Sequence, residues 1–590
     1  MKKAINLLYI NIVLFCNLVG KPIPQPGENI WYLAARIGTA LDQIAVDSSL
    51  CCNSTFTVIE STANTLSSKI DLLDANVQDC CTILDSKVDS VQLQLSLCCS
   101  SIDTALTRLD GTPLIIPPTG TTITTPGYYC LAADVTLLAG SFVATNTSDV
   151  VLDLNQHTIT AGEGLSVLAG NNRVTIQNGF IVSSATNGLI LTGTNENITL
   201  KNLEISSSPN GISCTNQSNL LISNINISDV SNGILPTTCN NTIIQDCNII
   251  GKIDSTSLIG LSFNAGGITA PNNCILINRV KVDTFAIGFN FLNISSLQAN
   301  DCIACNNWRT GATDAGFIIT DTDTTLPQKH ILRRCTSQVN ASNGFLISQG
   351  GSSAAYILVN CAAMGNSTLN TGAGNGFTTT RTNGTFINCI SSGMSVGFNC
   401  DGGNNNFTGC SAENSSTVGM NVISTKNYFL GCNCNKNGSN GFGSVNTNNV
   451  FENCISDNNA ANGFSASTAA SSNSFVRCVA CSDATTGIAV IGNANLITNC
   501  MANVNTIGFG SLTLPAGSST IFQNCTAEGN TTFGFQGSST NTAVYYLNTA
   551  NANGTTAGTD NFNTVASPNS APTSGITSVT RRYGDNLRGI

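Results

Sequence analysis

The stretch NCISDNNAANGF, residues 453–464, decides the fold because the chain repeats it. Variants are RCTSQVNASNGF at 334–345 and NCTAEGNTTFGF at 524–535. Its glycine recurs at spacings that fall to 21 or 22 residues and never exceed 32. A period of this length, with occasional longer repeats, indicates a solenoid in which each repeat is one turn. The positions are Gly164, Gly188, Gly211, Gly233, Gly260, Gly288, Gly316, Gly344, Gly376, Gly397, Gly419, Gly441, Gly463, Gly487, Gly508 and Gly534.

The residues within one repeat predict an all-β fold, a right-handed parallel β-helix of about 16 coils. Short segments such as VFENCIS (450–456) alternate in the way that strands require. A leucine-rich repeat would need its L-x-x-L-x-L pattern, and a propeller blade would be about twice as long. We expect the glycine to mark a tight turn, preceded by an asparagine with a left-handed backbone. The Phe or Leu after it should point inward and stack on the next coil.

The cysteines of the second half follow the same period, eight or nine residues before most of the glycines. Equivalent positions of successive coils lie above one another, so these thiols should form an internal column. Parallel side chains suit a disulfide poorly, and we expect free thiols. The C-x2-C pairs Cys302/Cys305 and Cys478/Cys481 are then one inward thiol plus a turn residue rather than a metal site.

Residues 1–20 have the pattern of a secretory signal peptide, with two lysines before an apolar run. Two alternatives stay open: a lipidated Cys16 and an uncleaved membrane anchor. No later run reaches the roughly 18 apolar residues of a spanning helix, so no transmembrane segment is expected after the signal. The sequence therefore predicts a secreted, cell-surface or periplasmic protein.

Residues 28–110 are predicted to form a helical coiled-coil stalk, because apolar residues alternate in steps of three and four from Ile59 to Leu109. Three cysteine pairs fall on one stripe of such a helix. They can form inter-chain disulfides in a homo-oligomer, or remain reduced as small apolar residues of the seam. No His or C-x2-C pair accompanies them to indicate a zinc site. The six residues are Cys51, Cys52, Cys80, Cys81, Cys98 and Cys99.

Residues 111–164 are interpreted as a linker, a cap and the first coil. They contain TTPGYYCLAAD (124–134) and VLDLNQHTI (151–159). These segments resemble the opening of the pectin-lyase-like right-handed parallel β-helix proteins, which include periplasmic copper-maturation and mannuronan-epimerase-like relatives. Gln156 stands where that family usually has glycine. The resemblance implies the β-helix fold but no particular activity. The repeat itself places the β-helix over 165–564, and the loss of its rhythm places a C-terminal tail over 565–590.

Composition excludes one class of partner. Charged residues make up 9% of the chain and the net charge is −10, with no block of Lys or Arg. Nucleic acid is therefore not expected as a ligand.

The coils between Gly233 and Gly376 are longer than the rest, and extra turn residues can build the walls of a site. Catalytic candidates there are Asp321, Asp323, His330 and Arg333, and ligand-binding candidates are Trp308, Arg309 and Asp314. The two aspartates lie two residues apart, so both can face outward, where they can cleave a glycosidic bond or hold calcium. The alternative is a polar turn with solvated charges. No other cofactor and no metal site are expected, and His157 is interpreted as a packing residue of the cap.

The sequence lacks the N-T-D, G-H-G and R-I-K segments of polygalacturonases. We therefore expect a non-enzymatic rod that binds carbohydrate or a host surface, or that is purely structural. The alternative is a polysaccharide lyase, hydrolase or epimerase acting on an acidic glycan.

Overall fold

The computed structural model describes residues 114–564, with gaps at 117–121, 138–140, 253–257, 265–273, 308–314, 322–328, 341, 349–354, 366–373, 512–518, 538–541 and 555–561, and residues 587 and 588. The predicted signal peptide, the stalk with its six cysteines, and most of the tail lie outside these residues. So do Trp308, Arg309, Asp314 and Asp323.

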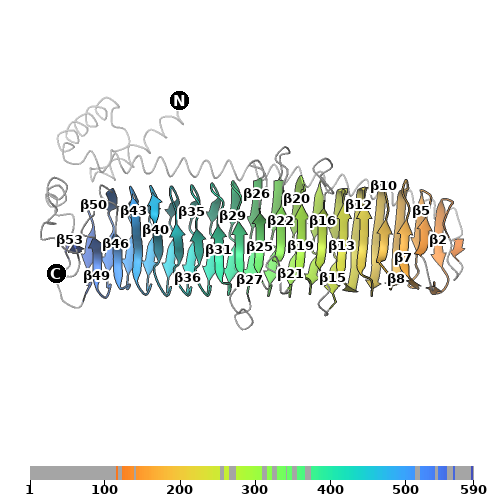
Figure 1. Cartoon of the computed structure of the whole chain (residues 1–590), viewed down its shortest axis with the longest axis horizontal. Coiled ribbons are helices and arrows are strands. Elements are labelled where there is room, and N and C mark those ends of the chain that lie inside the picture. Colours follow the sequence, from red (N-terminus) through yellow and green to blue (C-terminus); the bar gives the residue numbers. More distant parts are fainter. Residues whose placement is uncertain are drawn as a thin grey trace, which may run out of the picture. The chain divides into compact units, whose positions relative to one another are not determined.

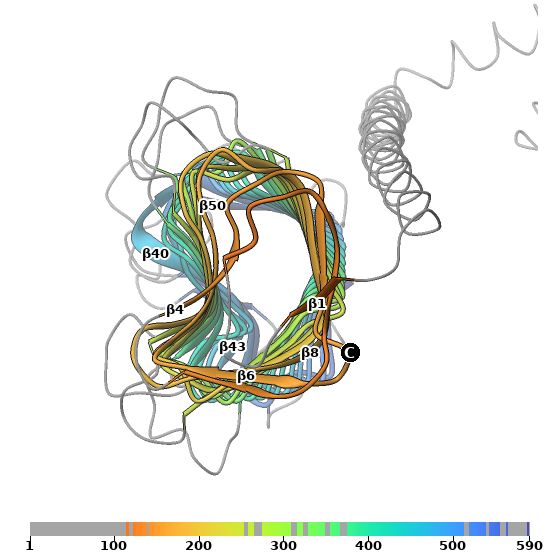
Figure 2. The ribbon, with the colours of Figure 1, turned by 90° about the vertical axis from the view of Figure 1, so that its right-hand side faces the viewer.

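The described residues form a parallel β-helix of about 15 turns, which confirms the predicted fold. One coil consists of β38 (Val450–Glu452), β39 (Ile455–Asp457) and β40 (Phe464–Ser471). Each pairs in parallel with the equivalent strand of the next coil, β41 (Ser474–Val476), β42 (Val479–Cys481) and β43 (Thr486–Asn493). The coils follow one another along the long axis in Figure 1, and seen end-on in Figure 2 they lie over one another.

The first two strands of each coil build one sheet, sheet A, and the third strand builds a second, sheet B. Sheet B runs from β4 (Ser141–Thr145) to β52 (Phe562–Thr564). In the early coils the two strands of sheet A are continuous across the bend between them, as β8 (Asn172–Ser183), β10 (Asn195–Ser206) and β12 (Gln217–Val230).

Both ends of sheet A extend beyond the predicted coils. The predicted linker contains β1 (Leu114–Ile116), which pairs with β2 (Gly127–Leu131). At the other end, β53 (Leu587–Arg588) pairs with β51 (Thr549–Asn551). Short segments that sequence analysis assigned to linker and tail therefore contribute strands to the sheet.

The interior consists of columns of identical side chains, as predicted. The phenylalanines that follow the repeat glycines stack face to face, with ring centroids 4.5 Å apart for Phe289 and Phe317 and 4.8 Å apart for Phe345 and Phe377. A second phenylalanine column lies inside sheet A, where Phe407 and Phe429 are 4.7 Å apart. Burying one such ring contributes about 1.5–3 kcal/mol to stability, so the repeat itself supplies the core.

The repeat cysteines form the expected internal column of free thiols. They lie at the bend between the two strands of sheet A and are buried. Each Sγ–H donates to a carbonyl of the preceding coil, as Cys454 does to Phe429 O at 3.4 Å and Cys478 to Phe451 O at 3.4 Å. These hydrogen bonds satisfy the thiols without a disulfide.

The left-handed backbone predicted for the asparagine before the repeat glycine is wrong, since neither Asn343 nor Asn462 has a positive φ. The glycines are required because successive coils approach closely. A Cβ on Gly316 would lie 2.8 Å from the carbonyl oxygen of Gly344, and one on Gly344 would lie 2.5 Å from that of Gly376. One left-handed residue of the repeat is instead the one before the cysteine, for example Asn453 with a φ of 52°. It makes the bend in sheet A.

Two further bends carry buried ladders of asparagine. In the first, the backbone N–H of Asn405 donates to Asn427 Oδ1 at 2.9 Å, and Asn427 donates to Asn449 in the same way at 2.8 Å. In the second, Asn437 donates to Asn459 and Asn459 donates to Asp483. These side chains satisfy backbone groups that the turns would otherwise leave buried and unpaired.

The residues of the opening motif join the first two coils. Asp153 accepts hydrogen bonds from Tyr128 Oη, Gln177 Nε2 and Asn178 Nδ2. His157 Nδ1 lies 3.4 Å from Asp134 Oδ1. This placement agrees with a structural role for His157.

Candidate functional site

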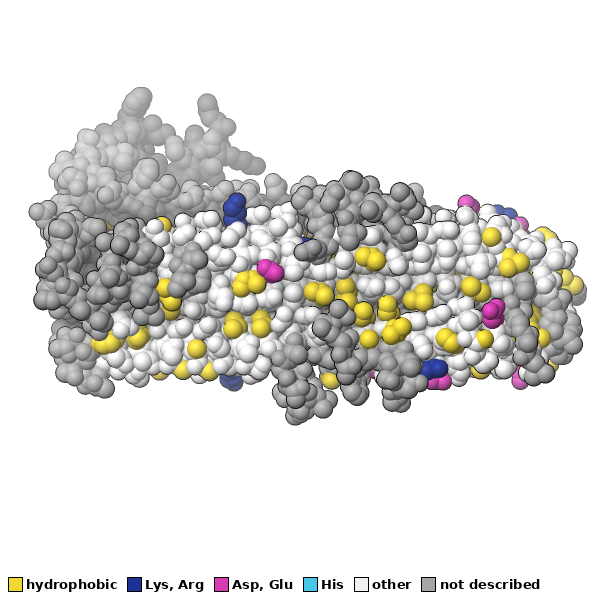
Figure 3. All heavy atoms as spheres, in the orientation of Figure 1, with side chains coloured by type: hydrophobic (Ala, Val, Ile, Leu, Met, Phe, Trp, Pro, Cys, Tyr) yellow, Lys and Arg dark blue, Asp and Glu magenta, His cyan; other side chains and the backbone are white. Residues whose placement is uncertain are grey.

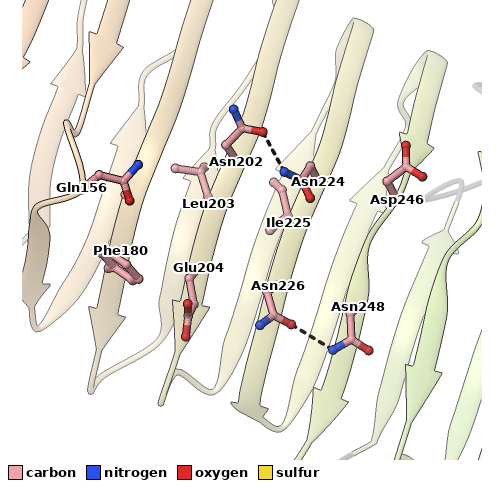
Figure 4. Close-up of a pocket in the computed structure, with 11 residues that line it drawn as sticks. Gln156, Phe180, Asn202, Leu203, Glu204, Asn224, Ile225, Asn226, Asp246 and Asn248 are labelled. Atoms are coloured by element: carbon pink, nitrogen blue, oxygen red, sulfur yellow. Dashed lines mark hydrogen bonds between the residues drawn. The ribbon is translucent and has the colours of Figure 1, made fainter.

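A groove with a volume of about 470 Å³ lies on the outer surface of sheet A. It begins at Gln156, follows the bend of β8, β10 and β12 in the next three coils and ends at β15 (Asn248–Gly251). Two rows of outward side chains flank it along the axis of the solenoid (Figure 4). We call the left-handed residues Asn202, Asn224 and Asp246, with the adjoining Asn178 that does not itself line the groove, the corner row, and Phe180, Glu204, Asn226 and Asn248 the second row.

Local backbone geometry produces the two rows. A left-handed residue interrupts the alternation of each strand, with φ of 54° at Asn202 and 52° at Asn224. The next residue then points into the core, where Leu203 and Ile225 are buried, and the one after it points outward again. Two outward positions therefore flank a residue that is buried in the core, and the pattern repeats in each coil at a rise of about 4.8 Å.

The asparagines of both rows are held in place by one another. In the corner row, Asn202 Nδ2 donates to Asn178 Oδ1 at 3.0 Å, and Asn224 Nδ2 donates to Asn202 Oδ1 at 2.9 Å. In the second row, Asn248 Nδ2 donates to Asn226 Oδ1 at 2.9 Å. These contacts fix the orientation of the amides before any ligand arrives.

The charges at the groove are acidic. Glu204 is exposed and has no hydrogen-bond or ion-pair partner among the described residues. Asp246 is neutralised by Arg279, whose Nε and Nη2 donate to its carboxylate at 2.6 and 2.9 Å. Neither Lys nor Arg is among the side chains that line the groove.

Beyond Asp246 the same bend carries alternating charges. Arg334 binds Asp301 through two hydrogen bonds of 2.7 and 2.8 Å, just as Arg279 binds Asp246. The guanidinium of Arg334 beside it lowers the pKa of Asp301. The amide-lined stretch of the bend therefore ends at Asp246, where ion pairs replace the asparagines.

The catalytic candidates of the long coils meet inside the solenoid rather than at its surface. Asp321 follows β22 (Ala315–Thr320), and His330 lies in β23 (Lys329–Arg333). His330 Nε2 is 2.7 Å from Asp321 Oδ2, and Arg381 Nη1 donates to the same oxygen at 2.8 Å. The side chains of Asp321 and His330 are 1% and 0% exposed. The expectation that Asp321 faces outward is therefore wrong.

This buried cluster keeps Asp321 ionised. Burial alone would raise the pKa of the Asp321 carboxyl, but the hydrogen bond from His330 and the charge of Arg381 outweigh it and hold the pKa below its ordinary value. Asp321 therefore forms a buried ion pair with Arg381 and a buried hydrogen bond with His330. Neither Asp321 nor His330 can reach a substrate on the surface.

The neighbouring residues show what the cluster does for the fold. His330 is in register with Leu297 on one side and Tyr356 on the other. Tyr356 Oη lies 2.6 Å from Thr379 Oγ1 and donates to Asn405 Oδ1 at 2.7 Å. The interior column thus changes from aliphatic residues to polar ones and then to the asparagine ladder that begins at Asn405. The cluster lies at this transition.

The structure separates Arg333 from the cluster, because residues 330 and 333 point to opposite faces of β23. Among the described residues, no group of three or more His, Cys, Asp or Glu side chains is arranged to hold a metal ion. The part of the chain that the structure describes also contains no helix long and apolar enough to span a membrane.

Sequence analysis did not find the groove, which lies mainly before the long coils. A signal was present, because Asn178, Asn202, Asn224 and Asp246 recur at spacings of 24, 22 and 22 residues, the period of the repeat. When the early coils are aligned on this position, they show one column of mostly polar residues here and a second column two residues later.

No family model matches the sequence, and no curated protein matches it. Solved structures with a similar fold include a surface adhesin of Streptococcus pneumoniae, PfbA, with 11% identity over 60% of this chain and 83% of that chain at a TM-score of 0.30. A periplasmic alginate epimerase, AlgG, has 13% identity over 60% and 78% at 0.30. A tailspike mutant of E. coli bacteriophage HK620, in complex with a pentasaccharide, has 13% over 72% and 72% at 0.30. At these values the likenesses carry no functional argument.

Proposed function

We propose that the chain is an exported surface or secreted rod that binds a carbohydrate chain in the groove of β8, β10, β12 and β15. The observation that carries the proposal is the set of outward asparagines that orient one another by hydrogen bonds, Asn178, Asn202 and Asn224 in the corner row and Asn226 and Asn248 in the second row. Fixed polar groups lose little conformational freedom when they bind, which is the general advantage of a preorganised site. Export and assembly through the predicted stalk remain predictions.

The enzymatic alternative requires an acid or a base within hydrogen-bond reach of a substrate. Asp321 and His330 are bonded to each other in the core, so we favour binding over turnover. Incubation with a panel of uronates tests the alternative. Unsaturated or epimerised products that are formed by the wild type and lost in Glu204→Gln or His330→Gln would contradict a purely binding role.

Isothermal titration of the full chain with neutral and acidic oligosaccharides tests the binding site. We expect the double variant Asn202→Ala/Asn224→Ala to weaken binding about tenfold or more, which corresponds to about 1.4 kcal/mol. The matched control is Asn399→Ala/Asn421→Ala, an outward amide pair on sheet B joined by a hydrogen bond of 2.8 Å. Equal loss in both double variants would place the ligand elsewhere.

A further inference from the structure

Resting on this proposed function, we propose that the ligand is a neutral, N-acetylated glycan that lies along the axis of the solenoid. The groove combines three properties that together select this class of polymer: outward amides that donate and accept, the half-buried ring of Phe180, and no Lys or Arg among the lining side chains.

The amide rows recognise groups that both donate and accept. A primary amide has two N–H donors and two acceptor lone pairs on its oxygen. Within the corner row, Asn202 uses one donor towards Asn178 and one lone pair towards Asn224. Its second N–H and second lone pair remain for the ligand. An acetamido group offers the complementary N–H and carbonyl.

The methyl group of an acetamide has one apolar contact in the groove, the half-buried ring of Phe180 at one end. The side chains of Leu203 and Ile225, between the two rows, point into the core. Removing a methyl group and one face of a sugar ring from water is favourable at about 25 cal/mol per Å². A glycan that carries only hydroxyl groups cannot use this surface as fully.

Charge argues against an acidic glycan. The carboxylate of Glu204 lines the groove, and the guanidinium of Arg279 is already bound to Asp246. Charged side chains are also few and scattered over the face of the molecule shown in Figure 3. A polyuronate would meet repulsion from Glu204 with no Lys or Arg among the lining side chains to offset it.

The length of the site follows from the bend itself. The rows run along the axis at about 4.8 Å per coil, so an extended polymer meets equivalent amides in successive coils. Ion pairs replace the amides beyond Asp246. The site therefore spans four coils, and a hexasaccharide is long enough to fill it.

The test is isothermal titration of the full chain with four hexamers: N-acetylglucosamine, glucosamine, glucose in β-1,4 linkage, and galacturonate. We expect the N-acetylglucosamine hexamer to bind at least tenfold more tightly than each of the others. Equal or tighter binding of the glucose hexamer, the glucosamine hexamer or the galacturonate hexamer would overturn the N-acetyl proposal but leave carbohydrate binding in place. Failure of all four to bind at millimolar concentration would overturn both.

Three variants, one of them a matched control on sheet B, locate the selectivity. Asn224→Asp keeps the shape but removes the N–H donors, so it should reduce the preference for the N-acetylated hexamer to less than threefold. Asn421→Asp, the same change on sheet B, should leave that preference unchanged. Glu204→Gln should weaken the glucosamine hexamer alone. An unchanged preference in Asn224→Asp would contradict recognition by the corner row, and circular dichroism checks that each variant is folded.

Discussion

Asp483 should make the stability of the solenoid depend on pH. It occupies a position of the buried ladder where neighbouring coils have Asn459 and Asn505, and it is 1% exposed. Its Oδ1 accepts from the N–H of Asn459 at 3.0 Å, whereas its Oδ2 has no partner among the described residues. In Asn459 and Asn505 the equivalent atom is an amide nitrogen that donates to a carbonyl of the preceding coil. A protonated carboxyl can replace that donor, but a carboxylate cannot.

The sign of the effect follows from where the proton is held. Burial raises the pKa of Asp483 from 3.8 to about 7, against the opposing hydrogen bonds from Asn459 and Ser456. The folded chain therefore binds more protons than the unfolded chain between these two values. The free energy of unfolding falls as the pH rises through this window and is constant above it. The difference between the two pKa values corresponds to about 4 kcal/mol in the free energy of unfolding, of which about 3 kcal/mol is lost between pH 5 and pH 8.

Native-state hydrogen exchange of β39 and β42 measures this locally, because a solenoid need not unfold in one step. After correction for the intrinsic rate, protection in the wild type should fall about 100-fold from pH 5 to pH 8 relative to Asp483→Asn. Asn505→Asp should introduce a similar dependence one coil further on. Asp401→Asn, which removes an exposed carboxylate, should change nothing. Identical pH profiles for the wild type and Asp483→Asn would refute the reasoning.

Three other predictions concern the fold. Gly376→Ala places a Cβ 2.6 Å from the carbonyl oxygen of Gly397 and should lower the free energy of unfolding by about 1–3 kcal/mol. Its control, Gly431→Asn, lies at a φ of 60° with open space around it and should change that free energy by no more than about 0.5 kcal/mol. Equal melting temperatures of the two variants would contradict the close approach of the coils. Arg381→Met leaves Asp321 buried beside a single neighbour and should lower stability by about 3–5 kcal/mol in thermal melts, and a neutral result would show that the cluster is not ionic. Cys454, whose pKa is raised by burial, should react with Ellman's reagent only after unfolding, and rapid reaction in the native protein would contradict its place in the core.

Much of the fold could be predicted because each column of the solenoid appears in the sequence as a period. Phe464 and Cys454 repeat at one coil length, and both lie where the period places them. The reason for Gly463 could not be predicted, because the atom that excludes a side chain is the carbonyl oxygen of Gly487 in the next coil. A local pattern that is consistent with a turn cannot reveal a contact between coils.

The functional candidates were harder to predict, for two physical reasons. Asp321 and Arg381 are bonded although they are 60 residues apart, and no spacing in the sequence indicates that contact. Asn202 and Asn224 have the composition of ordinary turn residues, and only their register across coils places them in one groove. The charged residues Asp321 and Arg381, which are rare types in this chain, form an internal ion pair, whereas asparagine, a common type, lines the surface groove.

The stacking of equivalent residues also sets how such a chain can change in length. Excising residues 432–453 would join Gly431 to Cys454 and leave the thiol, phenylalanine and glycine columns continuous, because each coil pairs only with its neighbours. Coils differ in length by up to 11 residues, from 21 to 32, without interrupting these columns, so residues added or lost within a coil change its turns. The length of the solenoid itself changes only by whole coils, at about 4.8 Å each.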